Sequence, residues 1–232
     1  AAVRAPAVSA PPACGTPVPD DPRRVPDGHR VRRHVPRHDG SRPDDAVGTD
    51  RDAVENDDVP TVSALLRRGF DPNARNPRGQ VGLYLALRSD SPRVAELLAA
   101  HPQIDIDAAN FDGETPLMIA ALRGDYHWVL RLLQRDAQIN RDGWTPLHYG
   151  AAGPNPKVVE LLLDEGAEIE ARAPDGSTPL MMAAIRGSEQ VVDLLLARGA
   201  STAPRDARGL RAVDRARGVG RDFLVKRLEP PR

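Results

Sequence analysis

Apolar residues recur at helical spacing through most of the chain, in short segments separated by polar loops. In residues 158–162 and 191–195, a pair of valines is followed by a pair of leucines, so that the i, i+3 and i+4 positions form one apolar face. Glycines 69, 166 and 199 follow such segments and favour the left-handed conformation that ends a helix. The pattern predicts many short amphipathic helices, and no apolar run reaches the roughly 18 residues of a membrane span.

A repeated segment precedes three of these helices. It reads Asp-Gly-x-Thr-Pro-Leu and begins at Asp112, Asp142 and Asp175, so that its Thr-Pro pairs start at residues 115, 145 and 178. A threonine at the start of a helix accepts a bond from a first-turn N–H, and a proline directly after it loses no helical hydrogen bond. Asp-Gly pairs suit tight turns. Each segment therefore predicts a hairpin turn followed by a capped helix.

A period near 33 residues, with Thr145-Pro146-Leu147-His148 intact, resembles the ankyrin repeat. The resemblance implies an all-α ankyrin-repeat solenoid of helix-turn-helix units linked by β-hairpin fingers. It also implies that the His148 imidazole bonds to backbone and braces neighbouring repeats, which Met118 and Met181 at the equivalent positions cannot do.

The repeats are expected to occupy residues 46–232, with an N-terminal cap at 46–78 and a C-terminal cap at 209–232. Four repeats lie between them, at 79–112, 113–142, 143–175 and 176–208. Residues 1–45 are rich in Pro and Arg and are expected to be disordered, either as a linker or as a misassigned start of the sequence. The repeat at 113–142 has only 30 residues, which indicates a shortened finger or a gap in the sequence.

Composition and motifs argue against several classes of function. The formal net charge is −1, which disfavours nucleic-acid binding, and the single cysteine, Cys14, excludes an internal disulfide and a cysteine-based zinc site. The sequence contains no phosphate-binding loop, zinc-protease motif or nucleophile elbow. We therefore expect neither an enzyme nor a cofactor.

Ankyrin repeats bind partners on the concave face, and the resemblance places variable residues of the fingers and first helices there. Phe111 and Trp144 would stand on adjacent fingertips beside arginines, a composition typical of interface hot spots. The alternative for Trp144 is that it only packs against the neighbouring finger, whereas Trp128 is assigned to the core. The expected partner-binding residues are Arg78, Arg88, Phe111, Glu114, Arg123, Trp144, Arg172 and Arg186.

These features predict a protein–protein interaction module, acting as an adaptor, scaffold or inhibitor, that is monomeric and binds another protein. The alternative is a targeting module of a bacterial effector, or of an enzyme whose catalytic domain is missing from this sequence. The segment from Gly143 to Ala151 is also similar to small ankyrin proteins of GC-rich proteobacteria, some of them exported. That similarity implies a bacterial cytoplasmic location, or a periplasmic one if an absent leader is a signal peptide.

Overall fold

The structure is a computed structural model and describes residues 51–229, so the expected disorder of residues 1–45 lies outside the described residues. Within residues 51–229 every regular element is helical, which confirms the all-α prediction. The helices are α1 (Arg51–Glu55), α2 (Val59–Arg67), α3 (Gly82–Ser89), α4 (Pro92–Ala99), α5 (Pro116–Arg123), α6 (Tyr126–Leu133), α7 (Pro146–Ala152), α8 (Pro156–Asp164), α9 (Pro179–Arg186), α10 (Glu189–Ala197), α11 (Ala212–Gly218), the 3-10 turn η1 (Asp222–Leu224) and α12 (Val225–Leu228).

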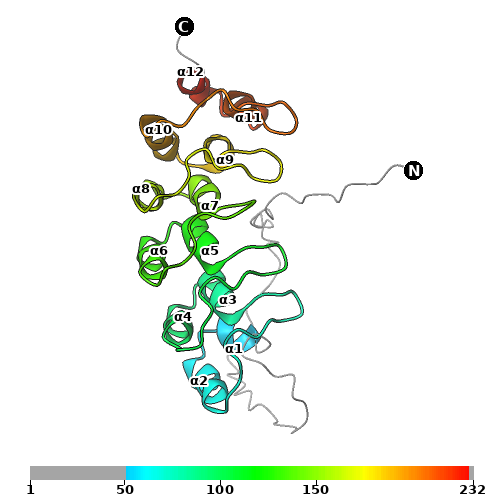
Figure 1. Cartoon of the computed structure of the whole chain (residues 1–232), viewed down its shortest axis with the longest axis vertical. Helices are drawn as coiled ribbons and strands as arrows, with labels where there is room; N and C mark the ends of the chain where they lie inside the picture. The colour runs from blue at the N-terminus through cyan, green and yellow to red at the C-terminus, as the bar shows by residue number, and fades with distance from the viewer. Residues whose placement is uncertain (1–50, 230–232) are drawn as a thin grey trace, which may run out of the picture. The chain divides into compact units, whose positions relative to one another are not determined.

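The helices stack as antiparallel pairs in two columns (Figure 1). An inner column contains α1, α3, α5, α7, α9 and α11, each packed against the next, and an outer column contains α2, α4, α6, α8, α10 and α12. Loops between successive pairs project beside the inner column as fingers. The fingers of the described part are hydrogen-bonded turns and not extended hairpins, since their single β-bridge joins Arg75 and Val81.

The Thr-Pro segments cap the inner helices as the sequence predicts. The hydroxyls of Thr115, Thr145 and Thr178 accept bonds from the backbone N–H three residues later, each at 3.4 Å. The following proline is the first helical residue in each case. In α3, Val81 replaces the threonine and forms no side-chain cap, yet the helix keeps the same length and place in the stack. Packing by neighbouring repeats therefore compensates for a missing cap.

The core is a continuous aliphatic layer between the two columns. Leu117, Leu147 and Leu180, one from each Thr-Pro-Leu segment, are fully buried or nearly so. Trp128 of α6 is 5% exposed, which confirms its assignment to the core. Burial of one such leucine contributes about 1.5–3 kcal/mol, and stacking continues the layer from one repeat to the next.

His148 joins two repeats, as the resemblance implies. Its Nδ1 accepts a bond from the Thr145 N–H at 3.2 Å, so its Nε2 carries the proton and donates to the Ser177 carbonyl at 3.0 Å. Burial of the imidazole lowers its pKa to about 4. At the equivalent place in α5, the Met118 sulfur contacts only the Thr115 N–H of its own repeat, at 3.5 Å.

The turn between the paired helices uses glycine for two different reasons. Gly124, after α5, has φ +72°, a left-handed conformation that favours glycine. Gly187, after α9, has φ −65° and ψ 161°, which any residue can adopt. A Cβ at Gly187 would lie 2.3 Å from the Ala151 carbonyl oxygen. Close approach of α7 and α9 therefore requires the glycine.

Candidate protein-interaction face

Five fingers and the inner helices α3, α5, α7, α9 and α11 form what we call the inner face. The fingers comprise residues 75–80, 109–114, 141–144, 172–177 and 205–210, numbered one to five. Three of them contain an Asn or Asp whose side chain accepts two backbone N–H bonds. Asn76 accepts from Arg78 and Gln80, Asn110 from Asp112 and Glu114, and Asp206 from Arg208 and Leu210. These bonds fix the conformation of the fingertips.

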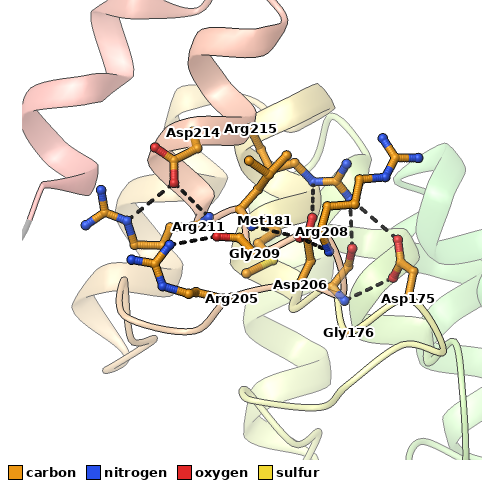
Figure 2. Close-up of polar contacts among 12 residues, drawn as sticks. Asp175, Gly176, Met181, Arg205, Asp206, Arg208, Gly209, Arg211, Asp214 and Arg215 are labelled. Carbon is orange, nitrogen blue, oxygen red and sulfur yellow. Dashed lines mark hydrogen bonds and ion pairs between the residues drawn. The ribbon is translucent and has the colours of Figure 1, made fainter.

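Arginines link neighbouring fingers through backbone carbonyls. Arg172 donates to the carbonyls of Gly176 in its own finger and Arg205 in the next, both at 3.0 Å. Arg75 does the same with Gly79 and Ala109. Arg205 donates to the Gly209 carbonyl at 2.7 Å (Figure 2). Because a carbonyl carries no net charge, these arginines remain uncompensated cations.

Finger five is also held by an ion-pair cluster at the C-terminal end of the stack (Figure 2). Arg215 of α11 donates to the Ser177 hydroxyl at 2.9 Å and lies 3.5 Å from the Asp175 carboxylate. Its Nε is 3.1 Å from Asp206 Oδ2, at an angle outside hydrogen-bond geometry. This cluster joins fingers four and five to the last inner helix.

Finger three is the shortened one. Asn140, directly before it, donates to the Gly166 carbonyl and accepts from the Glu168 N–H, just as Asn73 bonds to Gln103 and Asp105 two repeats earlier in the stack. The missing residues therefore fall between Asn140 and Gly143, at the fingertip. The helices on both sides keep their packing in the stack.

Trp144 follows the shortened tip and is half-buried. Its ring meets His148 edge-on at 5.4 Å between centroids and Tyr149 at 6.4 Å. Both contacts are with α7 of its own repeat, and edge-to-face pairs of this kind are stabilising. Part of the indole still reaches the surface of the inner face, while part supports the core.

Phe111 stands at the tip of finger two and is 73% exposed. Its ring lies against Gly79 of finger one, where an added Cβ would overlap the ring carbons. One side of the ring is therefore packed against finger one, although most of its surface faces solvent. A large, exposed aromatic ring is the kind of side chain that dominates binding energy at interfaces.

Glu114 differs from the expectation, because it is 4% exposed and not a surface residue of the fingertip. Its carboxylate accepts bonds from the Tyr84 hydroxyl at 2.5 Å, the Tyr149 hydroxyl at 2.9 Å and the Asn110 amide at 2.8 Å. Burial and the neighbouring carboxylate raise the pKa of both tyrosines well above the ordinary value. Glu114 thus joins three consecutive inner helices or fingers and is enclosed by them.

Tyr84 and Tyr149 belong to the inner face, and the sequence interpretation did not identify them. Tyr84 stands at the position that His148 occupies in its own repeat, and Tyr149 is one residue beyond it. A phenol at a position typical of an inter-repeat bond is the signal that could have identified Tyr84.

The five expected arginines lie exposed on the inner face. They differ in whether their side chains bond to other groups of the protein. Arg123 donates to the Arg88 carbonyl and forms an ion pair with Asp90 at 2.8 Å, and Arg172 bonds to carbonyls as described above. Arg78, Arg88 and Arg186 form no ion pair within residues 51–229, and Arg208 at the tip of finger five shares this state.

Three arginines of the outer column form ion pairs with carboxylates. Arg131 lies 2.5 Å from Glu96 on the preceding outer helix, Arg198 lies 2.7 Å from Asp164, and Arg227 lies 2.9 Å from Glu189. Each of these pairs connects one repeat to the one before it. These three arginines are thereby neutralised, whereas Arg93 and Arg135 on the outer side are exposed and form no ion pair within residues 51–229.

Neither a metal site nor a membrane-spanning helix occurs within residues 51–229. That part of the chain has no group of three or more His, Cys, Asp or Glu side chains placed to hold a metal ion. None of its helices combines the length and apolar character needed to cross a bilayer.

Comparison with known proteins agrees with this geometry. The family model described as "Ankyrin repeats (3 copies)" matches residues 51–142, 102–173 and 136–206, in overlapping segments that cover most of the chain. The protein belongs to the ankyrin-repeat family.

The curated relatives share the repeats over about half of this chain. Human transient receptor potential cation channel subfamily A member 1 is 29% identical over 119 residues, covering 50% of this chain and 11% of the relative. Human neurogenic locus notch homolog protein 2 is 35% identical over 106 residues, covering 44% and 4%. The mouse B-cell lymphoma 3 protein homolog is 31% identical over 118 residues, covering 48% and 26%. The chain therefore matches about a quarter or less of the length of these relatives.

Proposed function

We propose that this protein is an interaction module, acting as an adaptor, scaffold or inhibitor, that binds a partner protein on its inner face. Ankyrin repeats are generally protein-interaction modules, and the proposal applies that general role to one surface of this chain. The observation that carries it is Phe111, an aromatic ring that is 73% exposed on a finger whose backbone is fixed by the Asn110 side chain. Ordering such a ring on binding costs little, since the free protein already holds it in place.

The test compares two exposed aromatic residues on opposite sides of the molecule. Full-length protein would be used to capture partners, and the affinity for an identified partner would be measured for wild type, Phe111→Ala and Tyr126→Ala. Tyr126 is 42% exposed on the outer helix α6 and is the matched control. Truncation of a hot spot costs about 2 kcal/mol or more, so Phe111→Ala should weaken binding about thirtyfold.

Tyr126→Ala should leave the affinity within about twofold of wild type, a change that is small on the scale of a hot spot. Equal losses for the two variants, or an unchanged affinity for Phe111→Ala with its fold intact, would contradict the proposal. Trp144→Ala should weaken binding and also lower stability, because its ring contacts His148 and Tyr149.

A second candidate is that these repeats target a larger protein, such as an enzyme whose catalytic domain lies outside this sequence. The observation that favours it is that the three relatives are far longer than the region they share with this chain. Genomic sequence upstream of Ala1 decides between the two, since a catalytic domain there would favour targeting.

A further inference from the structure

The inner face carries an excess of positive charge that the whole chain does not. Its fingers and the helices α3, α5, α7, α9 and α11 contain eleven arginines and six carboxylates, whereas the formal net charge of the chain is −1. The arginines are Arg75, Arg78, Arg88, Arg123, Arg141, Arg172, Arg186, Arg205, Arg208, Arg215 and Arg217, and the carboxylates are Asp112, Glu114, Asp142, Asp175, Asp206 and Asp214.

The excess is not cancelled by contacts within the molecule. The linking arginines of fingers one, four and five donate to carbonyls, and four exposed arginines form no ion pair within the described residues. On the outer column, by contrast, Arg131, Arg198 and Arg227 contact carboxylates, although Arg93 and Arg135 are exposed without an ion pair within residues 51–229. The inner face therefore differs from the outer column in its net excess of arginines over carboxylates.

Four exposed arginines that, within the described residues, neither form ion pairs nor link fingers lie at the two ends of the inner face. Arg78 and Arg88 belong to finger one and α3, and Arg186 and Arg208 belong to α9 and finger five. Between these ends, the tips of fingers two and three carry the exposed carboxylates of Asp112 and Asp142 beside the Phe111 ring, with the half-buried Arg141 next to Asp142. Positive ends thus flank a middle that is close to neutral and apolar.

From this arrangement we infer that the inner face binds an extended segment of a partner protein with acidic residues near both ends and a neutral, apolar middle. The inference rests on the proposed function and names the chemistry of its partner. Three to four stacked helix pairs at 8–10 Å per step separate the two ends by roughly 24–40 Å. About 7–12 residues of extended chain, at ~3.3 Å each, span that distance.

A nucleic acid fits this pattern less well. Its phosphates follow one another at about 3.4 Å per strand, so they would pass directly over the carboxylates of Asp112 and Asp142. A peptide can place its carboxylates only where the arginines are, and its middle backbone N–H groups can donate to those same aspartates. The alternation of charge along the face therefore favours a protein segment.

The probe is a fluorescein-labelled peptide with three glutamates, nine neutral residues that include leucines, and three more glutamates. A peptide of the same composition with its six glutamates in the centre is the matched comparison. Full-length protein should bind the first peptide at least fivefold more tightly than the second. The affinity should fall as NaCl is raised from 50 to 300 mM, because exposed charges are screened over a shorter distance.

Two charge-matched double variants test which face is used. Arg78→Gln/Arg186→Gln should weaken binding of the end-charged peptide at least tenfold. Arg93→Gln/Arg135→Gln removes two exposed arginines of the outer side and should change the affinity less than twofold. All four side chains are exposed and form no ion pair within residues 51–229, so neither double variant should unfold the protein.

Three results would overturn the inference. They are no detectable binding of the end-charged peptide, equal losses for the two double variants, and tighter binding of a 15-nucleotide single strand than of the peptide. Partner capture that depends on Phe111 but is unaffected by Arg78→Gln/Arg186→Gln would overturn this inference and leave the proposed function standing.

Discussion

The inner and outer faces of the stack both contain arginines, and several of these arginines make different kinds of contact on the two faces. Outer arginines meet carboxylates one repeat back along the chain, as Arg131 meets Glu96. Inner arginines donate to carbonyls or extend into solvent, as Arg172 and Arg186 do. The outer ion pairs cancel charge between repeats, whereas the inner bonds to carbonyls leave the charge of those arginines uncancelled on the face proposed to bind a partner.

The faces differ equally in where they bury polar groups. The inner face encloses a carboxylate, Glu114, and an imidazole, His148, both hydrogen-bonded between repeats. Outer polar contacts stay at least partly exposed, as in the pair of Arg131 and Glu96. Buried polar groups depend on their exact partners, whereas exposed pairs contribute little. Loss of a single polar partner is therefore expected to cost more stability on the inner side than on the outer side.

Removal of the enclosed carboxylate should give the largest effect. Glu114→Ala leaves the Tyr84 and Tyr149 hydroxyls and the Asn110 amide without their shared acceptor. Since each unsatisfied buried group costs about 1–3 kcal/mol, we expect the free energy of unfolding in urea to fall by about 4 kcal/mol. Glu96→Ala on the outer face is the control and should cost less than about 1 kcal/mol. Similar losses for the two variants would show that the faces do not differ in this respect.

The comparison also shows what a sequence can reveal about such a fold. Capping by Thr115, the link from His148 to Ser177 and the burial of Trp128 follow from motif position, because each residue stands where the repeat pattern sets its surroundings. The exposure of Phe111 was also predictable, because its motif position lies at a fingertip.

The burial of Glu114 was not predictable in this way. It depends on two tyrosines from the repeats on either side, one in α3 and one in α7, and neither is typical of its motif position. The charge difference between the faces likewise depends on where each arginine points. A pattern of residue types determines the face of a helix but leaves the direction of a long flexible side chain open.

Acid should weaken the inner face through His148. The unfolded chain protonates this imidazole near pH 6.5, whereas the folded chain keeps it neutral until about pH 4. Because the unfolded state binds the proton first, stability from this group is present above pH 6.5 and is lost as the pH falls toward 4. The loss amounts to about 3 kcal/mol.

His148→Met, which introduces the residue found at this position in two other repeats, should remove that part of the pH dependence. Unfolding free energies would be measured at pH 7 and pH 4.5 for wild type, for His148→Met and for His127→Gln. His127 is on the outer helix α6 with 72% of its side chain exposed, and its replacement should leave the wild-type dependence unchanged. A wild-type slope in His148→Met would exclude His148 as its source.

The smallest effect should separate the two uses of arginine by their response to salt. Arg172→Gln removes bonds to the carbonyls of Gly176 and Arg205 and should lower the free energy of unfolding by about 1 kcal/mol. This loss should be nearly the same at 50 mM and 500 mM NaCl, because a hydrogen bond to a neutral carbonyl is short-ranged. Glu96→Gln should cost less, and its cost should shrink at high salt as the exposed pair with Arg131 is screened. If both losses shrink in parallel, the inner arginines also act through charge pairing, and the contrast between the faces is one of degree.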